Sequence, residues 1–288
     1  MRRIFSILAV AIAVAGVYAV HAGDTAETLA ARERAFAADA AERGWVASFE
    51  TFAAPEGFLF ARGHIANAHD FLKQFADQPK DTSLKWWPVW AGVAQSGDLG
   101  FTTGPVVVGN DEGFNYYFTV WAKQSDGEWR WIYDGGPPLA AKSPRGPDTP
   151  LRVMRQASGA LIEGADAARD AAHNADDAVA TKAAVDARGA LLSFLADDGA
   201  VTGSGLELDW GRDAATAELA ARPAAMTYTW IGGRGSAAGD IAFSYGSASW
   251  DGADGARTGN YVRVWRHDLS GWRIVYDFLR PVPLPKPR

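Results

Sequence analysis

The sequence predicts an α+β protein in which one domain fold occurs twice. The segment SGDLGFTTG at residues 96–104 is similar to AGDIAFSYG at 238–246, and YFTVW at 117–121 to YVRVW at 261–265. WRWIYD at 129–134 is likewise similar to WRIVYD at 272–277. The copies lie about 143 residues apart, which is a domain length, because solenoid and propeller repeats have periods of roughly 20–50 residues. In each copy helical patterns come first and aromatic, β-rich segments follow, an order typical of α+β domains.

The composition sets limits on the class of protein. A chain of 288 residues suits two domains, and 48% hydrophobic residues exclude a disordered polyampholyte. The formal net charge of −6, with no basic stripe, argues against a nucleic-acid partner. Cysteine is absent from the sequence, which excludes disulfides, thiolate metal sites and a cysteine nucleophile.

The N-terminal segment has the pattern of an export signal. Arg2 and Arg3 precede an apolar run from Ile4 to Val20, and small residues flank His21 at a cleavage site. We expect residues 1–22 to be a signal peptide, cleaved after Ala22, and the protein to be periplasmic or secreted. The alternative is an uncleaved anchor helix, because about 17 apolar residues are at the lower limit for spanning a bilayer.

The first copy is expected at residues 25–137. Apolar residues recur at helical spacing from Thr25 to Phe52, with Gly44 as a break between two helices. A short strand at residues 58–60 and a third helix from Ile65 to Phe75 follow. Four strands are then predicted, at residues 84–94, 99–108, 116–123 and 129–133. Tight Gly97-Asp98 and Asp126-Gly127 turns indicate that these strands form an antiparallel meander.

A Pro- and Gly-rich linker is expected at residues 138–150, and the second copy at 151–280. In the second copy the sequence predicts a helix from Leu151 to Ala196, a strand at 200–202, a short helix at 213–221 and four strands after Met226. Residues 281–288 alternate proline with other residues, which predicts an extended tail.

Several strings in the first copy resemble a known family. LKWWP at residues 84–88, SGDLGFTTGP at 96–105, FTVWAK at 118–123 and DGEW at 126–129 are similar to the SnoaL-like, ketosteroid-isomerase-like domains of the nuclear-transport-factor-2-like superfamily, in its exported bacterial branch of unknown function. The resemblance covers about residues 28–137 well and 160–280 more loosely. It implies two tandem conical α+β barrels, each with a pocket at its open end.

Domains of this family commonly pair through their sheets. The resemblance therefore implies that the sister domains pair within one chain as a pseudo-dimer, and that the protein is a monomer. The first copy keeps the family strings more completely, so any site is expected there.

Candidate catalytic residues follow from the resemblance to ketosteroid isomerases, which combine an Asp base with Tyr and protonated Asp donors. Glu56 lies in the turn after the helices, His64 follows the first strand, and Tyr117 and Asp134 lie on later strands. Each has a structural alternative, such as helix-end solvation for Glu56, simple exposure for His64, or capping for Asp134 and its counterpart Asp277.

Candidate ligand-binding residues are Arg62, near the expected pocket mouth, and four tryptophans of the first meander, Trp86, Trp90, Trp121 and Trp131. Strand alternation places Trp86 and Trp90 on one face. The alternative is that these rings fill the core or an interface. With no HExxH motif and five His in the chain, no metal site is predicted, and no cofactor is indicated.

The leading hypothesis is an exported protein that binds a small apolar or aromatic molecule. One alternative is an enzyme of the isomerase, dehydratase or cyclase type that uses acid and base residues of the first domain. The other is a noncatalytic scaffold whose aromatic sheet faces bind another protein.

Overall fold

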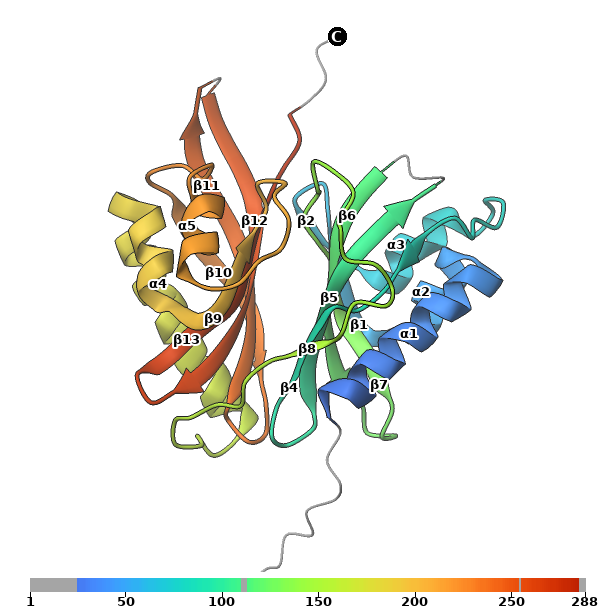
Figure 1. Ribbon diagram of the computed structural model, residues 1–288, viewed down its shortest axis with the longest axis horizontal. Coiled ribbons are helices and arrows are strands. Elements are labelled where there is room, and N and C mark those ends of the chain that lie inside the picture. The colour runs from blue at the N-terminus through green and yellow to red at the C-terminus, as the bar shows by residue number, and fades with distance from the viewer. Residues whose placement is uncertain (1–24, 110–112, 254, 285–288) are drawn as a thin grey trace, which may run out of the picture.

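The computed structural model describes residues 25–109, 113–253 and 255–284. The expected signal peptide at residues 1–22 lies outside this range, as do residues 285–288 of the expected tail. The predicted α+β class is confirmed: the described chain forms two sheets that face each other, with helices on the outer side of each (Figure 1). No helix of the described residues is long and apolar enough to cross a membrane.

The first domain has helices α1 (Ala26–Arg43), α2 (Trp45–Phe52) and α3 (Ala68–Leu72), with a 3-10 turn η1 (Lys73–Phe75). Its strands are β1 (Ala53–Ala61), β2 (His64–Asn67), β3 (Lys85–Trp86), β4 (Trp90–Val93), β5 (Leu99–Val108), β6 (Gly113–Lys123) and β7 (Trp129–Gly135). Their order in the sheet is β2-β1-β7-β6-β5-β4, with β3 also paired to β5.

Local sequence fixes the helical region. The side chain of Thr25 accepts a hydrogen bond from the Thr28 amide and forms a capping box that begins α1. Gly44 separates α1 from α2 in a backbone conformation with φ of 89°, which glycine adopts without strain.

The second domain has helices α4 (Ala165–Phe194) and α5 (Arg212–Leu219). Its strands are β9 (Leu195–Thr202), β10 (Thr227–Gly235), β11 (Ile241–Gly252), β12 (Gly255–Asp268) and β13 (Gly271–Pro281), in the order β10-β11-β12-β13-β9. Strand β9 runs parallel to β13, as β1 does to β7. The last four strands of each domain therefore form the same antiparallel meander, closed by a parallel strand.

Three sequence-based expectations were wrong in detail. Ile65 belongs to strand β2, and the helix expected to begin there begins at Ala68. The single strand expected at residues 84–94 is divided into β3 and β4 around Pro88, which has no amide hydrogen to donate to a ladder.

The helix expected from Leu151 begins only at Ala165. Residues Arg152–Val153 instead form β8, which extends the first sheet by pairing in parallel with β4. The segment after Pro150 is therefore part of the connection between domains, and it adds an edge strand to the first domain before the second begins.

The two sheets pack directly against each other. Phe118 of β6 stacks on Tyr276 of β13 with ring centroids 4.3 Å apart and an interplanar angle of 3°. Phe58 of β1 lies 4.4 Å from the ring of Tyr245 on β11. These rings belong to one buried cluster that contains side chains of both domains. The interface faces of the two sheets thus form a shared hydrophobic core.

The repeated Gly-Asp turns contact each other across this interface. Asp98 accepts a hydrogen bond from the Ala237 amide at 3.0 Å, and Asp240 accepts one from the Gln95 amide at 2.8 Å. Each contact is the counterpart of the other in the repeat, as in an isologous dimer interface. The repeated Asp therefore joins the domains, a role beyond the local turn chemistry that its sequence context indicates.

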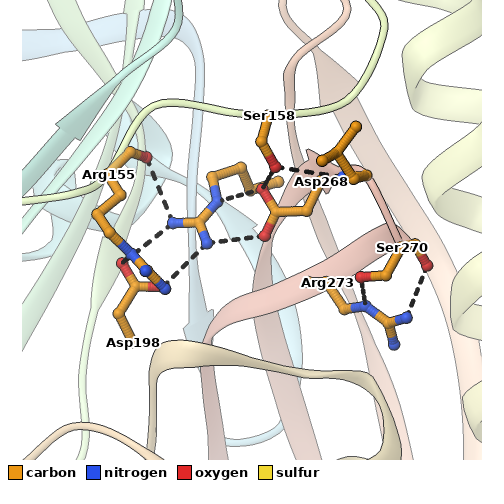
Figure 2. Close-up of polar contacts among 8 residues, drawn as sticks. Arg155, Ser158, Asp198, Asp268, Ser270 and Arg273 are labelled. Atoms are coloured by element: carbon orange, nitrogen blue, oxygen red, sulfur yellow. Dashed lines mark hydrogen bonds and ion pairs between the residues drawn. The ribbon is translucent and has the colours of Figure 1, made fainter.

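The connecting segment is held to the second domain by a charged network (Figure 2). Arg155 forms an ion pair with Asp198 at 2.8 Å, and Arg266 pairs with Asp198 and Asp268, at 2.9 and 2.8 Å. Arg266 also donates to the backbone carbonyl of Arg155. These bonds fix the chain where it passes from β8 toward α4.

Replacing Phe118 with Ala should lower the free energy of unfolding by about 3–5 kcal/mol, because it removes a buried ring that packs on the other domain. Urea unfolding followed by tryptophan fluorescence measures the change, with exposed Val153→Ala as the control. A Phe118→Ala variant as stable as the control would show that the shared core contributes little.

Candidate functional site

A cavity of about 220 Å³ lies in the first domain between the helices and the sheet, a space here called the first cone. Its walls are mostly apolar: Phe36 and Phe49 from the helices, Trp86 from β3 and Val106 from β5. The Phe36 ring lies 4.8 Å from Phe49 and 4.9 Å from Trp86. Asn115, Tyr117, Asp134 and Arg280 add polar groups to this apolar wall.

Glu33 of α1 is fully buried beside the cavity. Its carboxylate oxygens accept hydrogen bonds from the indole of Trp86 at 2.5 Å, the hydroxyl of Thr102 at 2.5 Å and the indole of Trp121 at 3.1 Å. Burial raises the pKa of Glu33 to about 7, and the three donors oppose part of this rise. A carboxyl group that is uncharged over much of the physiological range therefore lies behind the Trp86 wall.

Asp134, near the end of β7, lines the cavity itself. Its carboxylate accepts a hydrogen bond from the hydroxyl of Thr119 at 2.7 Å. Desolvation raises the pKa of Asp134 to about 8, and the nearby charge of Glu33 adds to this rise. The hydroxyl of Tyr117 is buried near these acids and has no hydrogen-bond partner among the described residues. Burial also raises the pKa of Tyr117.

The second domain has acids at the same two positions, but arginine side chains lie beside them in the space between α4 and the sheet, here called the second cone. Asp176 of α4 and Asp277 of β13 occupy the positions of Glu33 and Asp134 in the repeat. Arg263 replaces Thr119 and forms ion pairs with both acids. Arg222 adds a further ion pair to Asp277 at 2.6 Å.

The two cones therefore neutralise their buried acids differently. In the second cone two fully or nearly fully buried arginines balance two aspartates. In the first, the raised pKa values leave Asp134 mostly protonated and Glu33 about half protonated near pH 7, and the space taken by arginine in the other copy is free for a cavity. The site suggested by the better-kept family strings is thus the one in which a buried acid, Asp134, lines a cavity; the pocket in the second domain is lined by neither Asp176 nor Asp277.

The structure brings together five of the sequence-predicted residues. Trp86, Tyr117 and Asp134 line the cavity. Trp121 donates to Glu33, and Trp131 belongs to the same buried cluster as Trp86, without contact to the open space. Of the two tryptophans behind the wall, Trp121 thus supports the buried acid.

Four predicted residues lie elsewhere. Glu56 is exposed and forms an ion pair with Arg234 of the second domain at 3.4 Å. Arg62 and His64 are exposed at the β1–β2 turn. Trp90 packs in the shared core, 5.9 Å from Tyr276, because the Pro88 interruption turns it to the face opposite Trp86.

Simple alternation along β7 would place Trp131 and Tyr133 on one face, but they lie on opposite faces. Trp131 faces the helices, whereas Tyr133 faces the other sheet. A register shift between β6 and β7 leaves Ile132 as an extra residue and reverses the side on which later residues point. Because of this shift, Asp134 points into the first cone. The same shift occurs in the second domain, between β12 and β13.

Two residues of the site were missed by sequence reasoning. Glu33 has a weak signal, because the repeat spacing places it opposite Asp176, but Glu27 and Asp170 match at the same spacing, so the match alone does not single it out. Arg280 has none, because it belongs to the second domain and reaches the first cavity only through the pairing of the sheets.

The described residues contain no cluster of three or more His, Asp or Glu side chains that could hold a metal ion. The polar groups around the cavity are carboxyl, phenol, amide and guanidinium groups, which can bind and orient an organic ligand or move a proton.

No protein-family model matches the chain, and no curated protein matches it. Similar solved structures include a ketosteroid isomerase-like protein from Erwinia carotovora atroseptica SCRI1043, with 17% identity and a TM-score of 0.35 over 40% of this chain and 96% of that one. Another is an NTF2-like protein of unknown function from Pseudomonas putida KT2440, with 13% identity and a TM-score of 0.35 over 42% of this chain and 90% of that one.

A third is a putative scytalone dehydratase from Novosphingobium aromaticivorans DSM 12444, with 12% identity and a TM-score of 0.34 over 41% of this chain and 87% of that one. These are the kinds of protein that the sequence strings resemble. The similarities concern the fold alone.

Stability should decrease as pH rises, because both acids have pKa values raised above the ordinary 4.5 of Glu and 3.8 of Asp. Their protonation stabilises the folded state fully below about pH 4, and this contribution is lost as pH rises through about 7 to 8. Asp134→Asn should therefore lose less stability than the wild type between pH 5 and pH 9, by about 4 kcal/mol, because the folded state keeps its proton over about three pH units at about 1.36 kcal/mol each.

Thermal or urea unfolding at both pH values measures this difference, with exposed Asp77→Asn as the control. An Asp134→Asn variant with the same pH dependence as the wild type would contradict a raised pKa at Asp134.

Proposed function

We propose that the protein binds a small apolar or aromatic molecule in the first cone. The observation that supports this most directly is the contrast between the cones, since one holds two buried arginines and the other a cavity of about 220 Å³. An apolar wall with a few polar groups at one side is the usual character of a small-molecule site.

The scaffold alternative has less support. The aromatic rings expected to attract a partner protein, among them Trp90 and Phe118, are buried against the other sheet. The same burial supports the proposal that the sister domains act as an internal pseudo-dimer and that the protein is a monomer, which light scattering can check. The Arg2-Arg3 and apolar pattern of the N-terminal sequence supports export to the periplasm or beyond, which N-terminal sequencing can check.

Filling the cavity should abolish binding. Val106 lines the cavity from β5, and Val106→Phe adds a ring in that space. The probes are 2-naphthamide and benzamide, neutral aromatic compounds small enough to test the apolar wall, with affinity measured by isothermal titration calorimetry. We expect Val106→Phe to weaken binding roughly tenfold or more, which corresponds to about 1.4 kcal/mol.

The matched control is Val153→Phe, which adds the same ring at an exposed position on β8. It should bind as the wild type does. Binding that survives in Val106→Phe, or absence of binding to the wild type, would overturn the proposed site.

Acid–base catalysis in the same cavity is the second candidate. It is supported by the raised pKa of Asp134 and by the unpartnered hydroxyl of Tyr117 on the same cavity wall. Ionised Asp134 would accept a proton from the carbon next to a ligand carbonyl, while the electron pair of the broken C–H bond moves to the carbonyl oxygen. The Tyr117 hydroxyl would donate a hydrogen bond to that oxygen.

The probe for this step is 2-tetralone in deuterated water, with exchange of its α-hydrogens followed by NMR. The wild type should accelerate exchange with a rate that rises through about pH 8, and Asp134→Asn should not. Exposed Asp77→Asn is the control. Equal rates with and without the wild-type protein would reject catalysis of this kind and leave binding as the function.

A further inference from the structure

The cavity of the first domain receives one side chain from the second. Arg280, at the end of β13, lines it together with Asp134, Gly135 and Gly136. Its side chain is exposed, and its guanidinium makes no hydrogen bond or ion pair with any described residue. The charge of Arg280 nevertheless reaches the site, because it lowers the pKa of Asp134 against the larger effect of burial.

The face-to-face packing of the two sheets explains why Arg280 lies at the cavity of the first domain. The stack of Phe118 on Tyr276 places β13 across from β6 and β7, and β13 continues past Tyr276 to Pro281. The last residues of β13 therefore reach the rim of the first cone, where β7 ends.

The first domain does not supply an equivalent charged residue to the second cone. With Asp134 matched to Asp277, the counterpart of Arg280 is Pro137, which has no charge to offer the second cone. The second cone already contains two arginines of its own. Each cone thus has cationic groups, but in the first the cation stands at the rim, is supplied by the other domain and has no acid partner among the described residues.

Asp134 is not that partner. Both side chains are described, and they form no ion pair. Apart from Arg280, the described titratable residues that line the open space are Asp134, Tyr116 and Tyr117, all uncharged when protonated, with Glu33 behind the wall. An anion that enters the cavity would therefore meet one fixed positive charge at the rim and protonated groups inside.

We propose that the ligand of the first cone is an aromatic or apolar carboxylic acid, whose ring lies against Phe36, Phe49 and Trp86 and whose carboxylate binds Arg280. This inference rests on the proposed binding function and adds the charge of the ligand to it. Arginine matches a carboxylate with two parallel N–H donors, and the exposed rim lets that end of the ligand stay near water. The second domain thereby determines the specificity of the first.

The test compares acids with their neutral amides: 2-naphthoate with 2-naphthamide, and benzoate with benzamide, by isothermal titration calorimetry. The wild type should bind each acid roughly tenfold more tightly than its amide. Arg280→Gln should remove this preference by weakening binding of the acids far more than binding of the amides, and Arg280→Lys should restore part of it. Raising the salt concentration should weaken binding of the acids only, because the guanidinium is exposed.

The matched control is Arg273→Gln, which removes the same charge from the other end of β13 and should keep the preference for acids. Equal binding of acid and amide by the wild type, or a preference that survives Arg280→Gln, would overturn this inference and leave the binding function standing. If neither acids nor amides bind, or if both bind equally well to Val106→Phe, the proposed binding site itself fails.

Discussion

Burial of one sheet against the other is the constraint on which the rest of this structure depends. Each sheet carries helices on one side and would otherwise expose aromatic rings such as Phe118 or Tyr276 on the other. Their mutual burial removes these apolar faces from water, and the reciprocal bonds of Asp98 and Asp240 fix how the sheets are aligned. The arrangement also places the end of β13 at the rim of the first cone. The packing of the two sheets therefore determines that Arg280 lines the cavity on the helix side of the first sheet.

The two cones show two physical solutions to one problem. Both copies place an acid on the first helix and an acid on the last strand, in a space where a bare charge is costly. The second copy keeps the acids charged and supplies arginine, which fills the cone with ion pairs that are themselves expensive to desolvate. The first copy has Thr119 where Arg263 stands, so its acids are neutralised by protons and volume remains. Arg263 and Arg222, which have no counterpart arginine in the first copy, thus distinguish the second cone from the first.

This division explains why a duplicated domain is useful within one chain. A homodimer would give both cones the same interior and the same rim. Here the two interiors differ: β13 of the second domain presents Arg280 to the first cavity, while the second cone holds buried ion pairs. Because folds of this kind host unrelated activities, the charge and volume of the first cone carry more information about function than the architecture does.

The sequence by itself determined the duplication and the α+β class, because repeats, periodicity and turn residues are local signals. The cavity residues Tyr117 and Asp134 were candidates through the family resemblance, and Trp86 through the aromatic meander. The short β8 could not be predicted, since its partner β4 lies far away in the sequence. Strand β2 pairs with the neighbouring β1 across the turn at Arg62 and Gly63, and it was missed because most of its residues were assigned to the helix that follows. The face on which Trp90 lies was decided by the interruption at Pro88, and that of Tyr133 by a register shift between strands, so alternation failed for both. Arg280 entered the first site only through the packing of two sheets, a contact between residues that no local pattern connects.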